Sequence, residues 1–219
     1  MIEVTQIRKS YGKKKVLSDI TFQVKPGECV AIAGKNGCGK STLMQIMAGI
    51  LKPDGGELCY FGKKAAYKSS TFRRFCGYVP QENPLMEELT VQDNLKLWGG
   101  SHNANTKELV AQFQLEDLLQ TEVSKLSGGM KRRLSIACAL VENPPFLLMA
   151  EPTTALDLYY KESLHQWMKT YQQKNGIILM TTHDESEIRN ADRCLFMDEG
   201  KVQELDAEDI LQKFAGMSE

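Results

Sequence analysis

Nine residues, GKNGCGKST at positions 34 to 42, have the types and the spacing needed to hold a polyphosphate. The pattern G-x-x-x-x-G-K-[ST] lets the glycines adopt backbone conformations that other residues avoid, so that successive N–H groups converge on phosphate oxygens. A nearly all-apolar segment, ECVAIAG at 28–34, precedes this loop, and the amphipathic segment STLMQIMAGI at 41–50 follows it. Strand, glycine-rich loop and helix are the context that the motif requires.

Each position of this loop has a chemical reason. Lys40 brings a point charge to the β- and γ-phosphates, and the Ser41 hydroxyl can ligate Mg²⁺. The helix that follows adds the positive end of its dipole. We therefore expect ATP and Mg²⁺ as ligands. The residues predicted to bind the nucleotide here are Gly34, Lys35, Asn36, Gly37, Cys38, Gly39, Lys40, Ser41 and Thr42.

The hydrophobic pattern around the loop alternates between strands and helices. Alternating apolar residues at 2–8 and 16–24 predict half-buried strands. Continuous apolar runs predict strands covered on both faces, and 3.6-residue periodicity predicts the intervening helices. The further strands are expected at 57–61, 76–80, 144–150, 176–182, 194–198 and in the tail, and the helices at 41–50, 159–174, 184–191 and the chain end.

The pattern becomes helical between residues 82 and 143. Helices are expected at 90–98, with Thr90 as N-cap, at 105–113, and from Ser127 onward. The predicted fold class is α/β: a P-loop NTPase with a mostly parallel central sheet, an N-terminal antiparallel β part and an inserted α-helical subdomain. We expect one domain, with residues 1–82 and 144–219 as the catalytic α/β core and 83–143 as the helical subdomain.

Several motifs in order along the chain resemble the ATP-binding cassette (ABC) family of transport ATPases. Tyr11, in KSYGKK, resembles the aromatic residue that stacks on adenine, and Gln81, in GYVPQENP, resembles the glutamine that reaches Mg²⁺ and the attacking water. The most diagnostic motif is LSGGM at 126–130. The resemblance covers essentially the whole chain.

The LSGGM motif opens a long amphipathic helix. Ser127 is its expected N-cap, while Gly128 and Gly129 allow close backbone approach. Such a helix start favours an anion. The resemblance implies that this anion is the γ-phosphate of ATP bound to a second cassette, so that two cassettes pair head to tail as a homodimer or heterodimer.

Three more residues take their expected roles from the resemblance. Glu151, after the buried strand FLLMA, resembles the carboxylate that polarises the attacking water. His183, in TTHD, resembles the histidine that contacts the γ-phosphate, and Asp157, in TALD, resembles the loop that signals across the dimer. Together with Lys40 and Gln81, Glu151 and His183 form the expected catalytic set for phosphoryl transfer.

Ala150 departs from the family pattern. Members usually carry Asp here, immediately before the catalytic Glu, to hold the Mg²⁺ shell through water. A methyl group accepts no hydrogen bond, and Glu151 already has the water-polarising role. ATP binding should survive, but hydrolysis should be slower, since loss of a residue behind the metal ligands costs about 10–100-fold in affinity or activity. The residue is either a natural degenerate site or an introduced change.

Composition narrows the possible partners. The 219 residues carry a net charge of −1, without the basic excess of a nucleic-acid-binding protein, so we expect no nucleic-acid partner. There is no signal-peptide pattern and no apolar run of about 18 residues. The resemblance to transport ATPases implies a transmembrane permease subunit as the partner and a second cassette beside it, with the chain cytoplasmic and peripheral on the inner face of the cell membrane.

The remaining histidines and the cysteines have no expected chemical role. His102 and His165 are expected to face solvent. The cysteines form no C-x-x-C pair and have no histidine at zinc spacing, which indicates buried thiols in a reduced compartment. The six are Cys29, Cys38, Cys59, Cys76, Cys138 and Cys194.

The favoured function is the ATP-hydrolysing subunit of a membrane transporter, of the exporter-type branch that the segment after Gln81 resembles. Leu85, Met86 and Leu89 are expected to contribute to a docking groove for the membrane subunit, the alternative being packing within the helical lobe. Two other functions remain open. One is a non-hydrolysing or degenerate cassette that signals by binding ATP, which Ala150 favours. The other is a non-transport cassette protein of translation or DNA repair.

Overall fold

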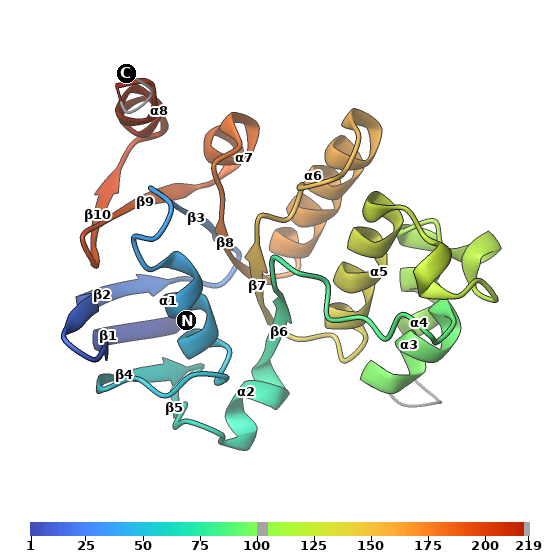
Figure 1. Cartoon of the computed structure of the whole chain (residues 1–219), viewed down its shortest axis with the longest axis horizontal. Helices are drawn as coiled ribbons and strands as arrows, with labels where there is room; N and C mark the ends of the chain where they lie inside the picture. The colour runs from blue at the N-terminus through green and yellow to red at the C-terminus, as the bar shows by residue number, and fades with distance from the viewer. Residues whose placement is uncertain (100–104, 217–219) are drawn as a thin grey trace.

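A computed structural model describes residues 1–99 and 105–216, in which two sheets and the helices around them form an α/β fold (Figure 1). The strands are β1 (Ile2–Tyr11), β2 (Lys14–Val24), β3 (Cys29–Gly34), β4 (Gly55–Tyr60), β5 (Lys63–Lys64), β6 (Cys76–Val79), β7 (Phe146–Ala150), β8 (Ile177–Thr181), β9 (Arg193–Asp198) and β10 (Lys201–Leu205). The α-helices are α1 (Lys40–Met47), α2 (Ser70–Phe75), α3 (Val91–Gly99), α4 (Asn105–Gln112), α5 (Gly128–Leu140), α6 (Leu158–Gln173), α7 (Glu185–Asn190) and α8 (Ala207–Ala215).

The two sheets differ in strand direction. The smaller is antiparallel with strand order β2-β1-β4-β5. The larger has the order β10-β9-β3-β8-β7-β6, and its neighbouring strands are parallel except for the antiparallel edge pair β9–β10. The predicted fold class is therefore confirmed. Because β3, β8, β7 and β6 are parallel, their carboxyl ends lie at one edge of the sheet.

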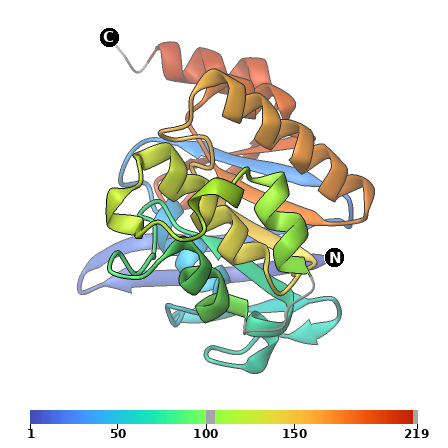
Figure 2. The same cartoon turned by 90° about the vertical axis from the view of Figure 1, so that its right-hand side faces the viewer.

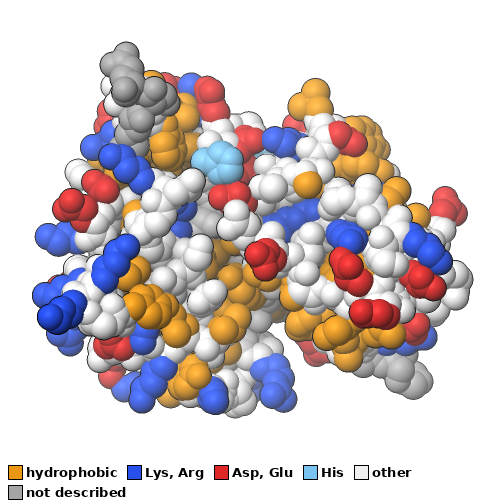
Figure 3. Space-filling model, in the orientation of Figure 1, with side chains coloured by type: hydrophobic (Ala, Val, Ile, Leu, Met, Phe, Trp, Pro, Cys, Tyr) orange, Lys and Arg blue, Asp and Glu red, His pale blue; other side chains and the backbone are white. Residues whose placement is uncertain are grey.

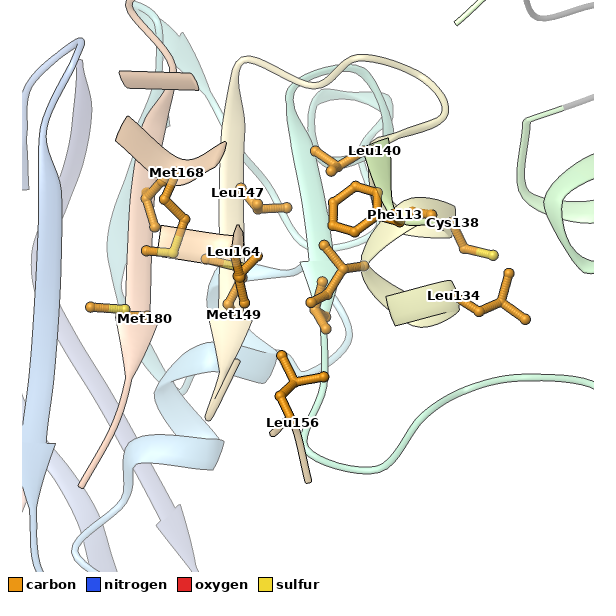
Figure 4. Close-up of a cluster of buried hydrophobic side chains, with 14 of the residues drawn as sticks. Phe113, Leu134, Cys138, Leu140, Leu147, Met149, Leu156, Leu164, Met168 and Met180 are labelled. Atoms are coloured by element: carbon orange, nitrogen blue, oxygen red, sulfur yellow. The ribbon is translucent and has the colours of Figure 1, made fainter. Parts of the chain in front are cut away.

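The central strands are buried on both faces. Every residue of β3, β7 and β8 is buried, which explains their unbroken apolar runs. Successive side chains point to opposite faces, so the two faces belong to two different hydrophobic clusters. One cluster lies on the side of the sheet covered by α5 and α6, where Leu147 and Met149 lie beside Leu164 and where Leu134 continues the cluster on the far side of α5 (Figure 4). The other fills the space between the parallel sheet, α1 and the antiparallel sheet.

The helices α3, α4 and α5 gather on one side of the molecule, at the right in Figure 1 and toward the viewer in Figure 2. The predicted cap at the start of α3 is present, since the Asp93 N–H donates to Thr90 Oγ1 at 3.1 Å. Ser127 likewise caps α5, accepting from the Met130 N–H at 3.3 Å. Both caps fix where the helical segment begins and where its longest helix starts.

The structure corrects one residue assignment and adds elements that the pattern did not predict. His165 lies on α6 and is only 9% exposed, so the expectation that it faces solvent is wrong. The helix α2 and the short strand β5 were not predicted; α2 is held by buried Phe72, whose ring meets Tyr60 edge-on. His102 lies outside the described residues. Among those described, no helix is long and apolar enough to cross a membrane.

Three of the six cysteines are buried as predicted, and the other three are partly exposed. Cys29, Cys138 and Cys194 are buried, and burial raises the pKa of Cys138 to about 12. Cys38, Cys59 and Cys76 are partly buried. All six are free thiols.

Burial of His165 makes the free energy of unfolding depend on pH. Desolvation lowers the pKa of its imidazole, so the unfolded chain binds this proton more readily than the folded one. The neutral, buried imidazole therefore contributes its full stabilisation above pH 6.5, the approximate pKa of histidine in the unfolded chain. This stabilisation is lost as the pH falls below that value. We expect the free energy of unfolding, measured by urea denaturation from pH 7.5 to pH 5.5, to fall less in His165→Gln than in the wild type. Parallel curves for the two proteins would contradict this.

Candidate active site

An open pocket of about 460 Å³ lies where the parallel strands end. It collects residues that are far apart in the sequence, including the phosphate loop, the residue after β6 and the end of β7. Its lining residues are Tyr11, Val16, Asn36, Gly37, Gly39, Lys40, Ser41, Thr42, Gln81, Ala150, Glu151 and Thr181. The structure thus brings together half of the residues predicted to bind ATP, and places Gln81 and Glu151 beside them. Val16 and Thr181 were not anticipated.

Glycine is required at two points of the phosphate loop. Gly39, the N-cap of α1, has φ of 114°, a region closed to L-residues, and a Cβ there would lie 2.9 Å from both the Val16 carbonyl oxygen and Leu17 Cδ2. At Gly34, a Cβ would lie 2.2 Å from the Met197 carbonyl oxygen. The loop therefore packs closely against β2 and β9 at the edge of the pocket.

The Lys40 ammonium is held by the loop that it follows. Its Nζ donates to the Gly34 carbonyl at 2.6 Å and to the Lys35 carbonyl at 2.9 Å, and lies 3.9 Å from Cys38 Sγ. The backbone of Lys35 and the thiol of Cys38 therefore contact the charge rather than the pocket. The arrangement concentrates one positive charge beside the N-terminus of α1, which favours a polyphosphate.

Glu151 follows β7 directly, in a left-handed backbone conformation with φ of 50°. Its N–H donates to the Thr181 carbonyl at 2.8 Å. One carboxylate oxygen, Oε1, lies 3.3 Å from His183 Nδ1, and Oε2 accepts from the Thr154 hydroxyl at 3.3 Å. Glu151 is the only acidic residue among those described as lining the pocket, and its neighbour Ala150 presents only a methyl group there. A carboxylate held in this way can polarise a water molecule.

His183 reaches the site from the end of β8. It lies with Glu151 in an adjoining depression and its side chain is 70% exposed. Burial raises the pKa of Asp184, but hydrogen bonds from Lys161 and Ser186 outweigh this, so that the pKa of Asp184 is lowered overall. The ionised Asp184 caps α7 by accepting from the Ser186 N–H at 2.9 Å. This cap fixes the backbone immediately after His183.

The remaining predicted residues lie outside this pocket. Ser127, Gly128 and Gly129 form the start of α5, where a Cβ on Gly129 would meet the Ala155 carbonyl oxygen at 3.0 Å. Asp157 caps α6 by accepting from the Tyr160 N–H at 3.0 Å. The LSGG segment and the TALD loop are therefore neighbours in this chain, but neither lines the pocket that holds Lys40.

Comparison with known proteins agrees with this geometry. A family model described as ABC transporter matches residues 17–154. The chain is 34% identical over 225 residues to the Nod factor export ATP-binding protein I of Rhizobium etli. The alignment covers 98% of this chain and 71% of that protein.

Solved structures show the same fold. A dimeric ATP-binding cassette in a post-hydrolysis state, bound to ADP and Pi, superimposes with a TM-score of 0.86 at 28% identity, covering 94% of this chain and 99% of that one. A bacterial Atm1-family ABC exporter with ATP bound gives a TM-score of 0.87 at 28% identity, covering 99% of this chain and 41% of that one.

The phosphate loop offers a matched pair of substitutions. Gly39→Ala should lower the free energy of unfolding by about 2–3 kcal/mol, because it combines a forbidden conformation with contact to backbone atoms. Gly37→Ala should cost only about 1 kcal/mol, since Gly37 has φ of 78° and open space around its Cβ position. Urea denaturation of the two variants measures the difference. Equal losses would show that the packing against Val16 and Leu17 does not constrain the loop.

Proposed function

The chain belongs to the ABC transporter family of ATP-binding cassettes, and we propose that it is the ATP-hydrolysing subunit of an exporter whose membrane-spanning part is a separate chain. The observation that carries this proposal is the meeting of Lys40, Ser41, Gln81 and Glu151 in one pocket. These are a phosphate-binding charge, two oxygen donors and a carboxylate that can polarise water, which is the set that phosphoryl transfer needs. Export as the direction is supported by the Rhizobium etli relative, an export ATP-binding protein.

In this proposal some pocket residues bind the nucleotide and others take part in the hydrolysis. The loop N–H groups and Lys40 hold the triphosphate, and Tyr11, which is 51% exposed at the pocket edge, stacks on the adenine. Glu151 polarises the attacking water, and His183, 3.3 Å from it, contacts the γ-phosphate. Gln81 follows β6 and orients the water from the opposite side of β7. Gln81, Glu151 and His183 each follow a strand of the parallel sheet, so the sheet sets their geometry.

The pocket also fits Mg²⁺. The Ser41 hydroxyl and the Gln81 amide oxygen line it together, and hard oxygen donors with several retained waters are what this ion prefers. When bound, the ion neutralises charge that develops on the phosphate oxygens. Ser41 and Gln81 would hold it directly, while Ala150 leaves the outer shell without the usual carboxylate.

A second cassette completes the site in this proposal. Ser127, Gly128 and Gly129 lie away from the pocket of their own chain, at the N-terminus of a 13-residue helix. A head-to-tail partner would bring its LSGG segment over the ATP, as expected for a family in which a similar cassette is dimeric. We also propose that residues 83–143 act as a helical subdomain within the single domain, with 1–82 and 144–219 as its catalytic core. In this arrangement the chain works at the inner face of the membrane.

Restoring the missing carboxylate tests the proposal and the role of Ala150 together. Ala150→Asp should raise Mg²⁺-dependent ATP turnover by about 10–100-fold, because it restores a partner for the metal-bound water. Steady-state phosphate release with the partner subunits present is the measurement. Glu151→Gln in both backgrounds is the control and should reduce turnover to background.

The two possible failures are distinct. Equal turnover in the wild type and in the Ala150→Asp variant would show that the site works without this carboxylate. ATP binding without turnover in either protein would instead favour the second candidate, a cassette that signals by binding ATP, which the methyl group of Ala150 makes a specific alternative.

An exposed apolar segment suggests where the membrane subunit docks. Met86 is 49% exposed and Leu89 is 38% exposed, whereas Leu85 packs partly against the hydrophobic cluster. Buried Asn94 fixes this segment on α3, accepting from the Met86 N–H at 2.9 Å and donating to the Met86 carbonyl at 3.0 Å. On the face drawn in Figure 3, apolar side chains lie among charges of both signs. Exposed apolar residues on a rigid backbone suit a protein interface.

Charge substitutions test this docking. Met86→Asp and Leu89→Asp should each weaken association with the membrane subunit by about 10-fold or more, because the charge is desolvated in the complex. Co-purification and titration of the two subunits measure this. Ile50→Asp, a change at a residue that is 58% exposed and follows α1, is the matched control. Unchanged association in the Met86 and Leu89 variants would remove the docking proposal.

A further inference from the structure

Arg132 is a buried cation on α5, and its guanidinium is fully used in hydrogen bonds to oxygen atoms. The residue is 2% exposed. Nε donates to the Pro152 carbonyl at 3.2 Å, and Nη1 donates to the Pro80 carbonyl at 2.6 Å and to Asn83 Oδ1 at 3.4 Å. Nη2 donates to the carbonyls of Ala150 and Glu151, the latter at 3.0 Å. A guanidinium has five N–H donors in a planar fork, and here each one has an acceptor.

The acceptors are at the two segments that bring catalytic side chains to the pocket. Ala150, Glu151 and Pro152 are successive residues at the end of β7. Pro80 and Asn83 flank Gln81, at the end of β6. One side chain from α5 therefore ties together the backbone on both sides of Glu151 and the backbone around Gln81, as the position of α5 beside β6 and β7 allows (Figure 1).

The backbone at Glu151 needs such support. Its φ of 50° is left-handed, which costs roughly 1–2 kcal/mol for a residue with a Cβ. Such a conformation persists only where neighbouring contacts over-determine it. The Glu151 N–H is held by Thr181, its carbonyl by Arg132, and beyond Pro152 the Thr153 N–H donates to Glu187 Oε1 at 3.1 Å. Arg132 and Glu187 thus both hydrogen-bond to the backbone of the turn at residues 150–153.

No other side chain could replace Arg132 here. Burial lowers the pKa of Arg132 to about 10, so the group stays charged at neutral pH. Lysine offers a single point charge and cannot span acceptors on two segments. An apolar residue would leave several buried carbonyls unsatisfied. The planar fork is therefore matched to this set of acceptors.

We infer that Arg132 is a positioning residue that holds Glu151 and Gln81 in register with each other for ATP hydrolysis. This inference rests on the proposed function, because it concerns the same reaction. It assigns to a buried residue that does not line the pocket the task of setting where the water-polarising carboxylate lies. It also links α5, which begins at Gly128 of the LSGG segment, mechanically to the catalytic carboxylate.

Arg133 is a matched control on the same helix. It is 5% exposed and also donates to carbonyls, those of Phe113 at 3.0 Å and Gln114 at 3.2 Å, and it lies over the Tyr160 ring at 4.0 Å. These contacts are at the end of α4 and on α6, away from residues 80–83 and 150–152. A change at Arg133 therefore removes a similar buried cation without releasing the catalytic segments.

The test compares Arg132→Lys, Arg132→Gln and Arg133→Gln. For the Arg132 variants, kcat should fall about 100-fold, as expected for a displacement near 1 Å, while KM and the Kd of a non-hydrolysable ATP analogue stay within about twofold. Arg133→Gln should lower the melting temperature but keep kcat within about threefold. Should Arg132→Gln fail to fold, Arg132→Lys, which keeps the charge, carries the test.

A second readout does not depend on turnover. Amide hydrogen exchange at Glu151 and Thr153 should accelerate about 10-fold in Arg132→Lys and remain at the wild-type rate in Arg133→Gln. Unchanged kcat and unchanged exchange in Arg132→Lys would overturn the inference, as would an equal fall in kcat for Arg133→Gln. Absence of turnover in the wild type would instead refute the proposed function, and the exchange rates would still decide the role of Arg132.

Discussion

The parallel pairing of β3, β8, β7 and β6 is the constraint on which the site depends. A part of the candidate site follows the carboxyl end of each strand. These parts are the phosphate loop after β3, Gln81 after β6, Glu151 after β7 and His183 after β8. Parallel pairing brings these ends to one edge, where ligands bind in open α/β sheets. This alignment requires an apolar core on both faces of the sheet, which the unbroken runs CVAIAG, FLLMA and IILMT provide.

Much of this could be predicted from the sequence because the relevant signals are local. The phosphate loop, the fully buried strands and the helix caps at Thr90 and Ser127 depend on neighbouring residues, and the structure contains them. The misses depend on tertiary contacts. His165 was expected in solvent, yet packing buries it on α6. In the same way α2 is fixed by Phe72 against Tyr60, a contact between residues that no periodicity connects.

In the candidate site, too, local signals could be predicted from the sequence and tertiary contacts could not. Motif spacing identifies Lys40, the family resemblance adds Gln81 and Glu151, and their meeting in one pocket follows from the sheet. Arg132 could not be found in this way, because a doubled arginine on an amphipathic helix is usually a solvated face. Its burial follows from the five oxygen acceptors that meet around it, and these come from segments about 20 and 50 residues away along the chain. Only the folded backbone assembles them.

Ala150 and the hydrogen bonds of Arg132 affect two different requirements of the proposed hydrolysis, namely metal binding and the position of Glu151. Ala150 removes a side-chain acceptor from the pocket, but its carbonyl remains bound by Arg132 and its neighbour Glu151 keeps its backbone hydrogen bonds. The carboxylate that the family pattern places at position 150 is therefore absent, while the backbone that holds Glu151 is intact. Since positioning and charge neutralisation are the two sources of phosphoryl-transfer catalysis, loss of one leaves the other intact. In the mechanism that we propose, Glu151 is therefore positioned for its role, and metal binding is what Ala150 weakens.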